Sequence, residues 1–312
     1  MVSGPRVLRV RADNMSPMTL DGTNTYLVEA GNGQAIVIDP GTRLPEHGDA
    51  IVLTARDNGL TIAAIAVTHG HPDHAPGAAP LAARTGAPVY AHAAAKFPHD
   101  HTLGEGDRLA LGNSALVAID APGHARDHLV FWFEDELCLF TGDVVIGDGS
   151  TVVIAPPGGD MRAYQATLHR LRDEFTRAAR IYGGHGEEIE EPQRVLDYYI
   201  AHREKREAEL IATLQQQGRQ TVPQIVEHVY HATPQALWPA AARQIFAYLI
   251  ALQREGRVIA HPLDREPNEF ERNILDPDLS RIVDANSRAV AAAELGIEPG
   301  AMTIEAFEIV EA

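Results

Sequence analysis

The stretch Thr68-His69-Gly70-His71-Pro72-Asp73-His74 follows an apolar run, 62–67, and places three imidazoles and a carboxylate within six residues. Such ligands at the end of a buried strand would repel one another or lose hydration unless a cation held them. Nitrogen and oxygen ligands of this kind suit zinc best. The stretch therefore predicts a metal site, and a solvated histidine-rich loop is the alternative reading of these residues taken alone.

Three further polar motifs also follow apolar runs, where a rigid strand can aim a side chain. Gly123-His124 comes after the run 116–119, Gly142-Asp143 after 137–140, and Gly183-Gly184-His185-Gly186 after 180–182. In their order and spacing, HxHxDH, GH, GD and GHG resemble the motifs of the metallo-β-lactamase superfamily, over roughly the first 190 residues.

This resemblance implies a four-layer αβ/βα sandwich with two metal ions at the ends of the strands. It assigns seven side chains to the two ions: His69, His71 and His124 to the first, Asp73, His74 and His185 to the second, and Asp143 as a bridge. Two neighbouring cations need anionic ligands to reduce their repulsion, and the two aspartates supply them. We therefore expect two zinc ions per chain, with iron or manganese also compatible with the second site.

Stretches at both ends resemble one group of the superfamily, the β-lactamase-like protein 2 group. Met18 to Val28 and Ile38 to Gly41 resemble its entry hairpin. Tyr198 to Glu207 resembles its YI-HR-RE helix, and Thr221 to His261 resembles its small winged-helix-like domain. With these stretches the likeness extends over about 260 residues.

A chain of 312 residues is longer than one compact core usually holds, so we expect more than one domain. The resemblance predicts a catalytic domain of metallo-β-lactamase fold over 1–199 and a winged-helix-like helical domain over 200–262. Residues 263–312 would form an acidic C-terminal extension that departs from the family pattern and could serve oligomerisation.

Periodicity predicts the elements of the second half of the chain. Apolar residues at helical spacing predict helices over 160–179, 191–217, 238–255 and 279–295. Residues 303–310 alternate in polarity, which favours an edge strand that could pair in a homodimer.

The predicted function is that of a dinuclear zinc-dependent hydrolase, in which a metal-bridging hydroxide cleaves a small ester, thioester, lactone or lactam. Two zinc ions can lower the pKa of a bridging water from about 15.7 towards 7. Asp143 would bridge the ions, and Asp73 could orient the hydroxide or take its remaining proton. A single-strand RNA endonuclease would share every ligand but needs a cationic path to the site. A non-catalytic metal-binding module is the third reading, although none of the ligands is missing.

Composition bears on partners and compartment. The chain has 26 basic and 43 acidic residues, a net charge of −17, which disfavours RNA because phosphate binding favours a basic surface. The single cysteine, Cys138, excludes an internal disulfide, favours a reducing compartment and reads as a small buried hydrophobe. No apolar run approaches the roughly 20 residues that span a bilayer, and the start lacks an apolar signal region. We expect a cytoplasmic protein that acts on a small molecule and binds no membrane.

Several polar residues near the motifs receive no ligand role. His128 and its neighbour Asp127 could orient a ligand or a substrate, or be structural. Asp39, at the end of an apolar run, resembles the family's strand-end aspartate that supports the metal loop. The alternating charges of 202–207 indicate a solvated or salt-bridged helix face. A second histidine cluster lacks anionic partners and is interpreted as surface: His92, His99 and His101.

Overall fold

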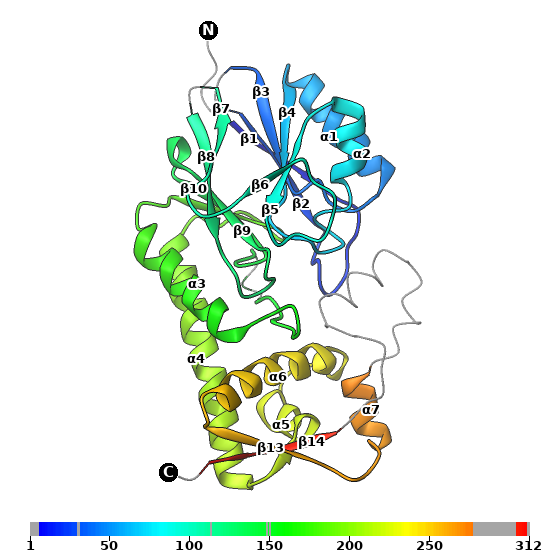
Figure 1. Cartoon of the computed structure of the whole chain (residues 1–312), viewed down its shortest axis with the longest axis vertical. Coiled ribbons are helices and arrows are strands. Elements are labelled where there is room, and N and C mark those ends of the chain that lie inside the picture. The colour runs from blue at the N-terminus through cyan, green and yellow to red at the C-terminus, as the bar shows by residue number, and fades with distance from the viewer. Residues whose placement is uncertain are drawn as a thin grey trace.

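Two β-sheets packed face to face, with helices on both outer faces, form the larger part of the chain (Figure 1). The structure is a computed structural model of the whole chain and describes residues 6–29, 32–112, 114–147, 149, 151–276 and 304–310. The predicted four-layer sandwich is confirmed.

The first sheet has six strands in chain order, namely β1 (Arg6–Arg11), β2 (Asn24–Glu29), β3 (Gln34–Ile38), β4 (Thr61–Ala66), β5 (Val89–His92) and β6 (His101–Leu103). Helices α1 (Pro45–Asp57) and α2 (Ala78–Thr85) cover its outer face. Strands β3 to β6 run parallel, so the loops after them leave the same edge of the sheet.

The second sheet has the strand order β11-β10-β9-β8-β7. Its strands are β7 (Arg108–Leu111), β8 (Ser114–Asp120), β9 (Leu129–Phe133), β10 (Cys138–Gly142) and β11 (Arg180–Gly183), with a 3-10 turn at Glu134–Glu136. Helices α3 (Met161–Glu174) and α4 (Pro192–Gln217) pack on its outer face.

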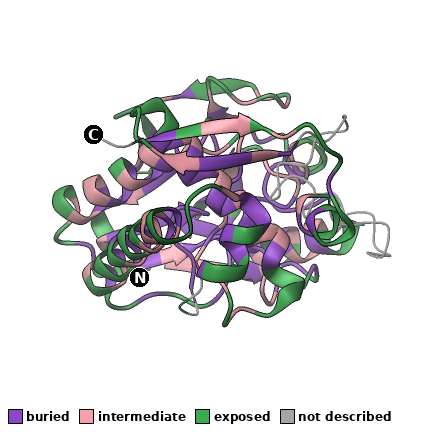
Figure 2. Ribbon diagram, turned by 90° about the horizontal axis from the view of Figure 1, so that it is seen from below, coloured by how far each residue is buried: buried purple, intermediate pink, exposed green. Residues whose placement is uncertain are grey.

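Central strands of the sandwich, such as β2 and β3, are buried on both faces because each face meets another layer (Figure 2). In β2, Tyr26 and Val28 enter the core between the sheets, whereas Leu27 points to the helices α1 and α2. This is the alternation expected of a pleated strand between two apolar layers. Cys138 lies buried in the core between the sheets, as predicted.

The smaller part of the chain is a helical unit with a three-stranded sheet. Its elements are β12 (Gln220–Thr221), α5 (Val222–Val229), the 3-10 turn Gln235–Leu237, α6 (Trp238–Arg254), β13 (Val258–Pro262), α7 (Glu269–Leu275) and β14 (Glu305–Ile309). Helix α4 runs from the sandwich into this unit (Figure 1) and so passes through the expected boundary at 199 and 200.

Two predictions for the second half need correction. The strand predicted at 303–310 exists, but it is not an edge strand, because β14 pairs with β12 on one side and β13 on the other. Alternating polarity indicates that one face of a strand is buried. It does not indicate whether the strand pairs on one side or on both. The helix predicted over 160–179 begins at Met161, after the cap Asp160, but ends at Glu174.

Other predicted helices lie close to their expected ranges. The helices expected over 191–217 and 238–255 are α4 and α6. The helix expected over 279–295 lies outside the described residues. Within the described ranges, none of the helices combines the length and the apolar composition that a membrane span requires.

Candidate metal centre

All four sequence motifs meet at one edge of the sandwich. The loop after β4 carries the histidine-rich stretch, the loop between β8 and β9 carries His124, Asp143 directly follows β10, and His185 follows β11. Strand β4 of one sheet and strands β10 and β11 of the other sheet all terminate at this edge. The fold therefore brings motifs that are distant in the sequence into one cluster.

The seven predicted ligands form three overlapping groups in which the potential ligand atoms lie within 4.8 Å of one another. The groups are His69-His71-His124, His69-His74-Asp143 and Asp73-His74-His185. The outer two groups have the same members as the two ligand sets implied by the resemblance. The middle group contains Asp143, the expected bridge.

Buried polar atoms inside this cluster lack hydrogen-bond partners. They are Nε2 of His69, Nε2 of His74, Oδ1 of Asp73 and Oδ1 of Asp143. Nε2 of His74 lies 3.4 Å from Asp73 Oδ2 and 3.4 Å from Asp143 Oδ1, and Nε2 of His185 lies 3.2 Å from Asp73 Oδ2. Buried polar atoms normally have partners, so nitrogen and oxygen atoms converging in this way suit one or more cations. The residues present therefore fit a metal group.

Backbone carbonyls fix the orientation of two of the imidazoles. Nδ1 of His124 lies 3.0 Å from the carbonyl oxygen of Val153, and Nδ1 of His185 lies 3.3 Å from that of Gly22. In the neutral form of the ring that binds a metal, Nδ1–H donates to the carbonyl and Nε2 is the acceptor that points into the cluster. Metal-binding histidines are usually oriented in this way.

Asp39 supports the loop after β4, as the sequence predicted. Its carboxylate accepts hydrogen bonds from the backbone N–H and the hydroxyl of Thr68, each at 2.7 Å, and lies 2.8 Å from Nδ1 of His74. These contacts hold the start of the loop and one potential ligand in place. Thr68 was not identified as a supporting residue from the sequence.

His128 is a positioning residue for Asp143. Its Nε2 accepts a hydrogen bond from the backbone N–H of Asp143 at 3.1 Å, and its ring stacks on that of His69 at 4.6 Å. Burial lowers the pKa of His128 well below its usual value, so the ring is neutral and can accept this bond. Asp127 belongs to none of the three groups and approaches Gly70 instead.

The two carboxylates of the cluster stay ionised. Burial alone would raise the pKa of Asp73 and of Asp143, but the neighbouring His74 and His185 outweigh burial and lower both pKa values. Reciprocally, burial would lower the pKa of His185, whereas Asp143 and Asp73 raise it to about 10. The cluster is thus an environment in which buried anions require positive charge beside them.

Gly184 makes room for the cluster. A Cβ atom at this position would lie 2.4 Å from Asp143 Oδ1 and 2.6 Å from Cε1 of His74, closer than any side chain tolerates. The glycine in the GHG motif is therefore required by close approach of two potential ligands.

The second histidine cluster is not brought to the metal centre. Nε2 of His92 lies 3.6 Å from Asp120, Nδ1 of His99 lies 2.8 Å from the carbonyl of Phe97, and the His101 ring packs against Tyr90. Among the described residues, none of the three joins a metal-holding group.

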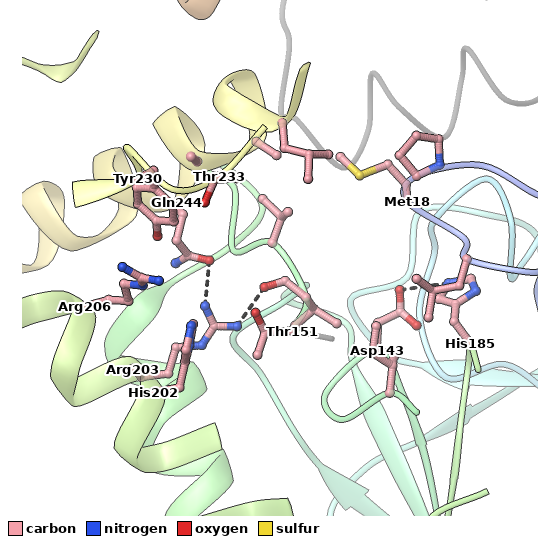
Figure 3. A pocket seen from close by; sticks show the side chains of 18 residues that line it. Met18, Asp143, Thr151, His185, His202, Arg203, Arg206, Tyr230, Thr233 and Gln244 are labelled. Carbon is pink, nitrogen blue, oxygen red and sulfur yellow. Dashed lines mark hydrogen bonds and ion pairs between the residues drawn. The ribbon is translucent and has the colours of Figure 1, made fainter. Parts of the chain in front are cut away.

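A pocket of about 280 Å³ opens beside the cluster, between the sandwich and the helical unit (Figure 3). Asp143 and His185 line one end, and residues of α4 and α6, including Arg203 and Gln244, line the other. The interpretation of 202–207 as a solvated or salt-bridged face is wrong for Arg203, which is 1% exposed. The sequence signal was its spacing: Arg203 falls on the same helix face as the buried Leu196, Tyr199, Ile200 and Leu210.

Comparison with known proteins agrees with this geometry. Residues 18–185 match the metallo-beta-lactamase superfamily, and residues 221–265 match the beta-lactamase associated winged helix domain. The chain is 32% identical to a beta-lactamase-like protein 2 homolog of Caenorhabditis elegans, over 82% of this chain and 86% of that protein.

Two further relatives have a lower identity or a shorter matched length. An atrochrysone carboxyl ACP thioesterase of Aspergillus chevalieri is 33% identical over 74% of this chain and 75% of that protein. The crystal structure of a metallo-beta-lactamase family protein from Thermus thermophilus has a TM-score of 0.67 and 22% identity, covering 83% of this chain and 96% of that one. With the metal-binding motifs assembled at one edge of the sandwich, the chain belongs to the metallo-beta-lactamase superfamily of hydrolases.

Proposed function

We propose that the protein is a dinuclear zinc-dependent hydrolase that cleaves a small ester, thioester, lactone or lactam. The observation that carries the proposal is the set of three overlapping groups in which seven buried or half-buried side chains converge. In this proposal His69, His71 and His124 hold one ion, Asp73, His74 and His185 hold the other, and Asp143 contacts both.

With both ions bound, they would supply an activated water at neutral pH and polarise the carbonyl of the substrate. The protein's own contribution is orientation. Asp73 is suited to orient the water, because its lowered pKa keeps the carboxylate ionised and its Oδ1 has no hydrogen-bond partner. The hydroxyl of Thr23 donates a hydrogen bond to the other oxygen of Asp73, Oδ2, at 3.3 Å and so orients the carboxylate.

Two observations favour a small acyl substrate. The pocket of about 280 Å³ lies just below the roughly 300–1,000 Å³ of pockets that hold drug-sized ligands. The relatives include proteins named as thioesterases. We therefore place thioesters first among the proposed bond classes.

RNA cleavage is the weaker alternative because the long helix of the winged unit carries two cations, both of which already have partners within the protein. Arg243 donates to the carbonyl of Leu275 at 2.6 Å, and Arg254 pairs with Asp160 at 2.6 Å. These are the two cations of α6, and both are engaged within the protein. A path for a polyanionic strand would have to lie elsewhere.

Elemental analysis tests the metal part of the proposal. Protein purified without chelator should contain close to two equivalents of zinc per chain. A stable value near one equivalent with full activity would exclude the dinuclear mechanism.

A substrate panel tests the chemistry. Metal-replete protein should hydrolyse an acyl thioester, an acyl lactone or nitrocefin, and His69→Ala should abolish this turnover. Labelled single-stranded RNA serves as the opposing substrate. Cleavage of the RNA at physiological salt, lost in His69→Ala, would replace the proposed function by that of a nuclease.

A further inference from the structure

Arg203 is a buried cation without an anion beside it. Its Nη1 donates to Oε1 of Gln244 at 2.8 Å and its Nη2 to the carbonyl of Val152 at 2.7 Å, while Nε has no hydrogen-bond partner. Within the part of the chain that the structure describes, no carboxylate forms an ion pair with this guanidinium, which is 1% exposed. A buried charge is costly unless it is paired.

The groups around Arg203 do not neutralise it. The guanidinium lies over the ring of Tyr164, with 5.1 Å from Cζ to the ring centroid, and its hydrogen-bond partners are neutral: amide and carbonyl oxygens and the Tyr164 hydroxyl. The neighbouring Arg206 differs, because Glu209 pairs with it at 2.7 Å. The uncompensated charge therefore belongs to Arg203.

Unpartnered donors at this end of the pocket come from two elements. Nε2 of Gln244 on α6 has no hydrogen-bond partner, nor does Nε of Arg203 on α4, and both residues line the pocket (Figure 3). The pKa of His202 is lowered to about 4, by burial first and then by the positive charges of Arg203, Arg206 and Lys205. Such donors suit an oxyanion.

The lining of the pocket mixes apolar side chains with polar ones such as Thr151. The apolar ones come from the entry loop, the sandwich and α6, among them Met18, Leu20, Ile146, Val152 and Ala241. A ligand that reaches from one end to the other would thus have a polar group at each end and an aliphatic spacer between them.

We propose that Arg203 and Gln244 bind a carboxylate of the substrate while its acyl carbonyl lies at the metal centre. The inference rests on the proposed function and deepens it: the substrate class is the monothioester or monoester of a small dicarboxylic acid. A guanidinium matches a carboxylate through two parallel hydrogen bonds, and a charge-assisted bond in a buried site is strong. In the reaction, water adds to the acyl carbon, the carbon–sulfur bond breaks, and the dicarboxylate and a thiol leave.

Paired substrates measure the proposed preference. The anionic member is a succinyl, glutaryl or adipyl monothioester of a simple thiol, and its neutral partner carries a carboxamide in place of the free carboxylate. Metal-replete wild-type protein should show a kcat/KM higher for the anionic member by roughly tenfold to a hundredfold, for at least one spacer length. Equal kcat/KM for both members of every pair would overturn the carboxylate site.

Gln244→Glu is the decisive variant because it supplies an internal anion to Arg203. A glutamate can still accept from Arg203 and from the backbone N–H of Ile154, so the fold should be retained. The ratio of kcat/KM between the anionic and neutral members should fall to about one. Arg56→Gln changes the net charge by the same amount at a residue whose side chain is 73% exposed, and should keep the wild-type ratio.

Equilibrium binding separates this inference from the proposed function. Titration calorimetry should show that glutarate binds wild-type protein roughly tenfold more tightly than its monoamide, and that Gln244→Glu abolishes the difference. That result without turnover of any ester or thioester would sustain the carboxylate site and refute the hydrolase. A retained anionic preference in Gln244→Glu would refute the carboxylate site alone.

Discussion

Asp143 is the residue whose side chain is most central to the proposed chemistry. Its carboxylate lies 3.4 Å from His74, 3.4 Å from His185 and 3.7 Å from His124. We expect Asp143→Ala to lower kcat/KM by more than about a hundredfold and to weaken binding of the second ion, because it removes the anion between two cations. Steady-state kinetics and elemental analysis measure these changes. Cys138→Ser, at the start of the strand that Asp143 follows, should keep both metals. Normal turnover in Asp143→Ala would show that the bridge is misassigned.

Gly184 allows a second test at the scale of one atom. Gly184→Ala should reduce metal content and activity without unfolding the protein, because the added methyl group occupies the space of the Asp143 and His74 side chains. Gly158→Ala is a matched control, since its Cβ would meet nothing closer than 3.9 Å. The pair can be compared by metal analysis and thermal unfolding. A fully metallated, active Gly184→Ala protein would show that the ligands can move away from this glycine.

Single residues also show which parts of the candidate site could be predicted from the sequence. The seven candidate ligands were predicted because their motifs follow apolar runs in an order and spacing shared with a family, and the structure brings the seven side chains together. Arg203 was misread because the alternating charges around it were given more weight than its spacing from the apolar residues of the same helix face. The roles of Thr68 and Gln244 depend on contacts between distant segments, which no local pattern contains.

Helices α3, α4 and α6 are joined by ion pairs around Arg162. This side chain contacts Glu207 of α4 and lies 2.6 Å from the carboxylate of Glu255, next to the end of α6. Arg162 lowers the pKa of Glu255 and, against the effect of burial, that of Glu207. A lowered carboxylate pKa stabilises the fold above the pKa of the unfolded chain, and this contribution is lost as pH falls through the folded value.

Arg162→Met should therefore destabilise the protein most at neutral pH. We expect a loss of about 1–2 kcal/mol in the free energy of unfolding. The difference in unfolding free energy between the variant and wild type should become smaller below about pH 4, where unpaired glutamates protonate. Urea unfolding at several pH values measures it. The control is Arg194→Met, because Arg194 pairs with Glu191 through side chains that are 79% and 65% exposed. A loss of unfolding free energy in Arg162→Met that does not change with pH would exclude the ion-pair explanation.

Helices and strands were predicted best where the periodic spacing of apolar residues determines their type and extent. Helices α4 and α6 were found within a residue or so because a proline lies in the first turn of each and Gly218 or Gly256 follows its end. The end of α3 was missed because apolar residues continue beyond Glu174 without helical geometry. Strand β14 was recognised, but its two neighbours come from residues 220–221 and 258–262, so its place in the sheet was not readable from its own sequence.

At the scale of the whole molecule, the net charge of −17 separates the two substrate classes. Turnover of a small thioester should change little as salt rises, whereas a strand held by several phosphate contacts would be lost steeply. Initial rates across a salt series, at constant pH and metal concentration, provide the measurement. A moderate decrease in rate with salt that is confined to the monoanionic substrates would agree with the carboxylate site. A steep decrease in the rate for a neutral thioester would contradict the proposal of a small-molecule substrate.

The central position of β14 also bears on how the protein is made. On the ribosome, the strands and helices of the sandwich leave the exit tunnel before those of the helical unit and can pair at once, whereas β12 and β13 must wait for β14, which is translated after both. Until that partner arrives, both present open strand edges, which are prone to pairing with other chains. A premature stop after codon 276 should therefore yield a chain whose sandwich forms but whose small sheet does not, and which aggregates more readily than the full-length product.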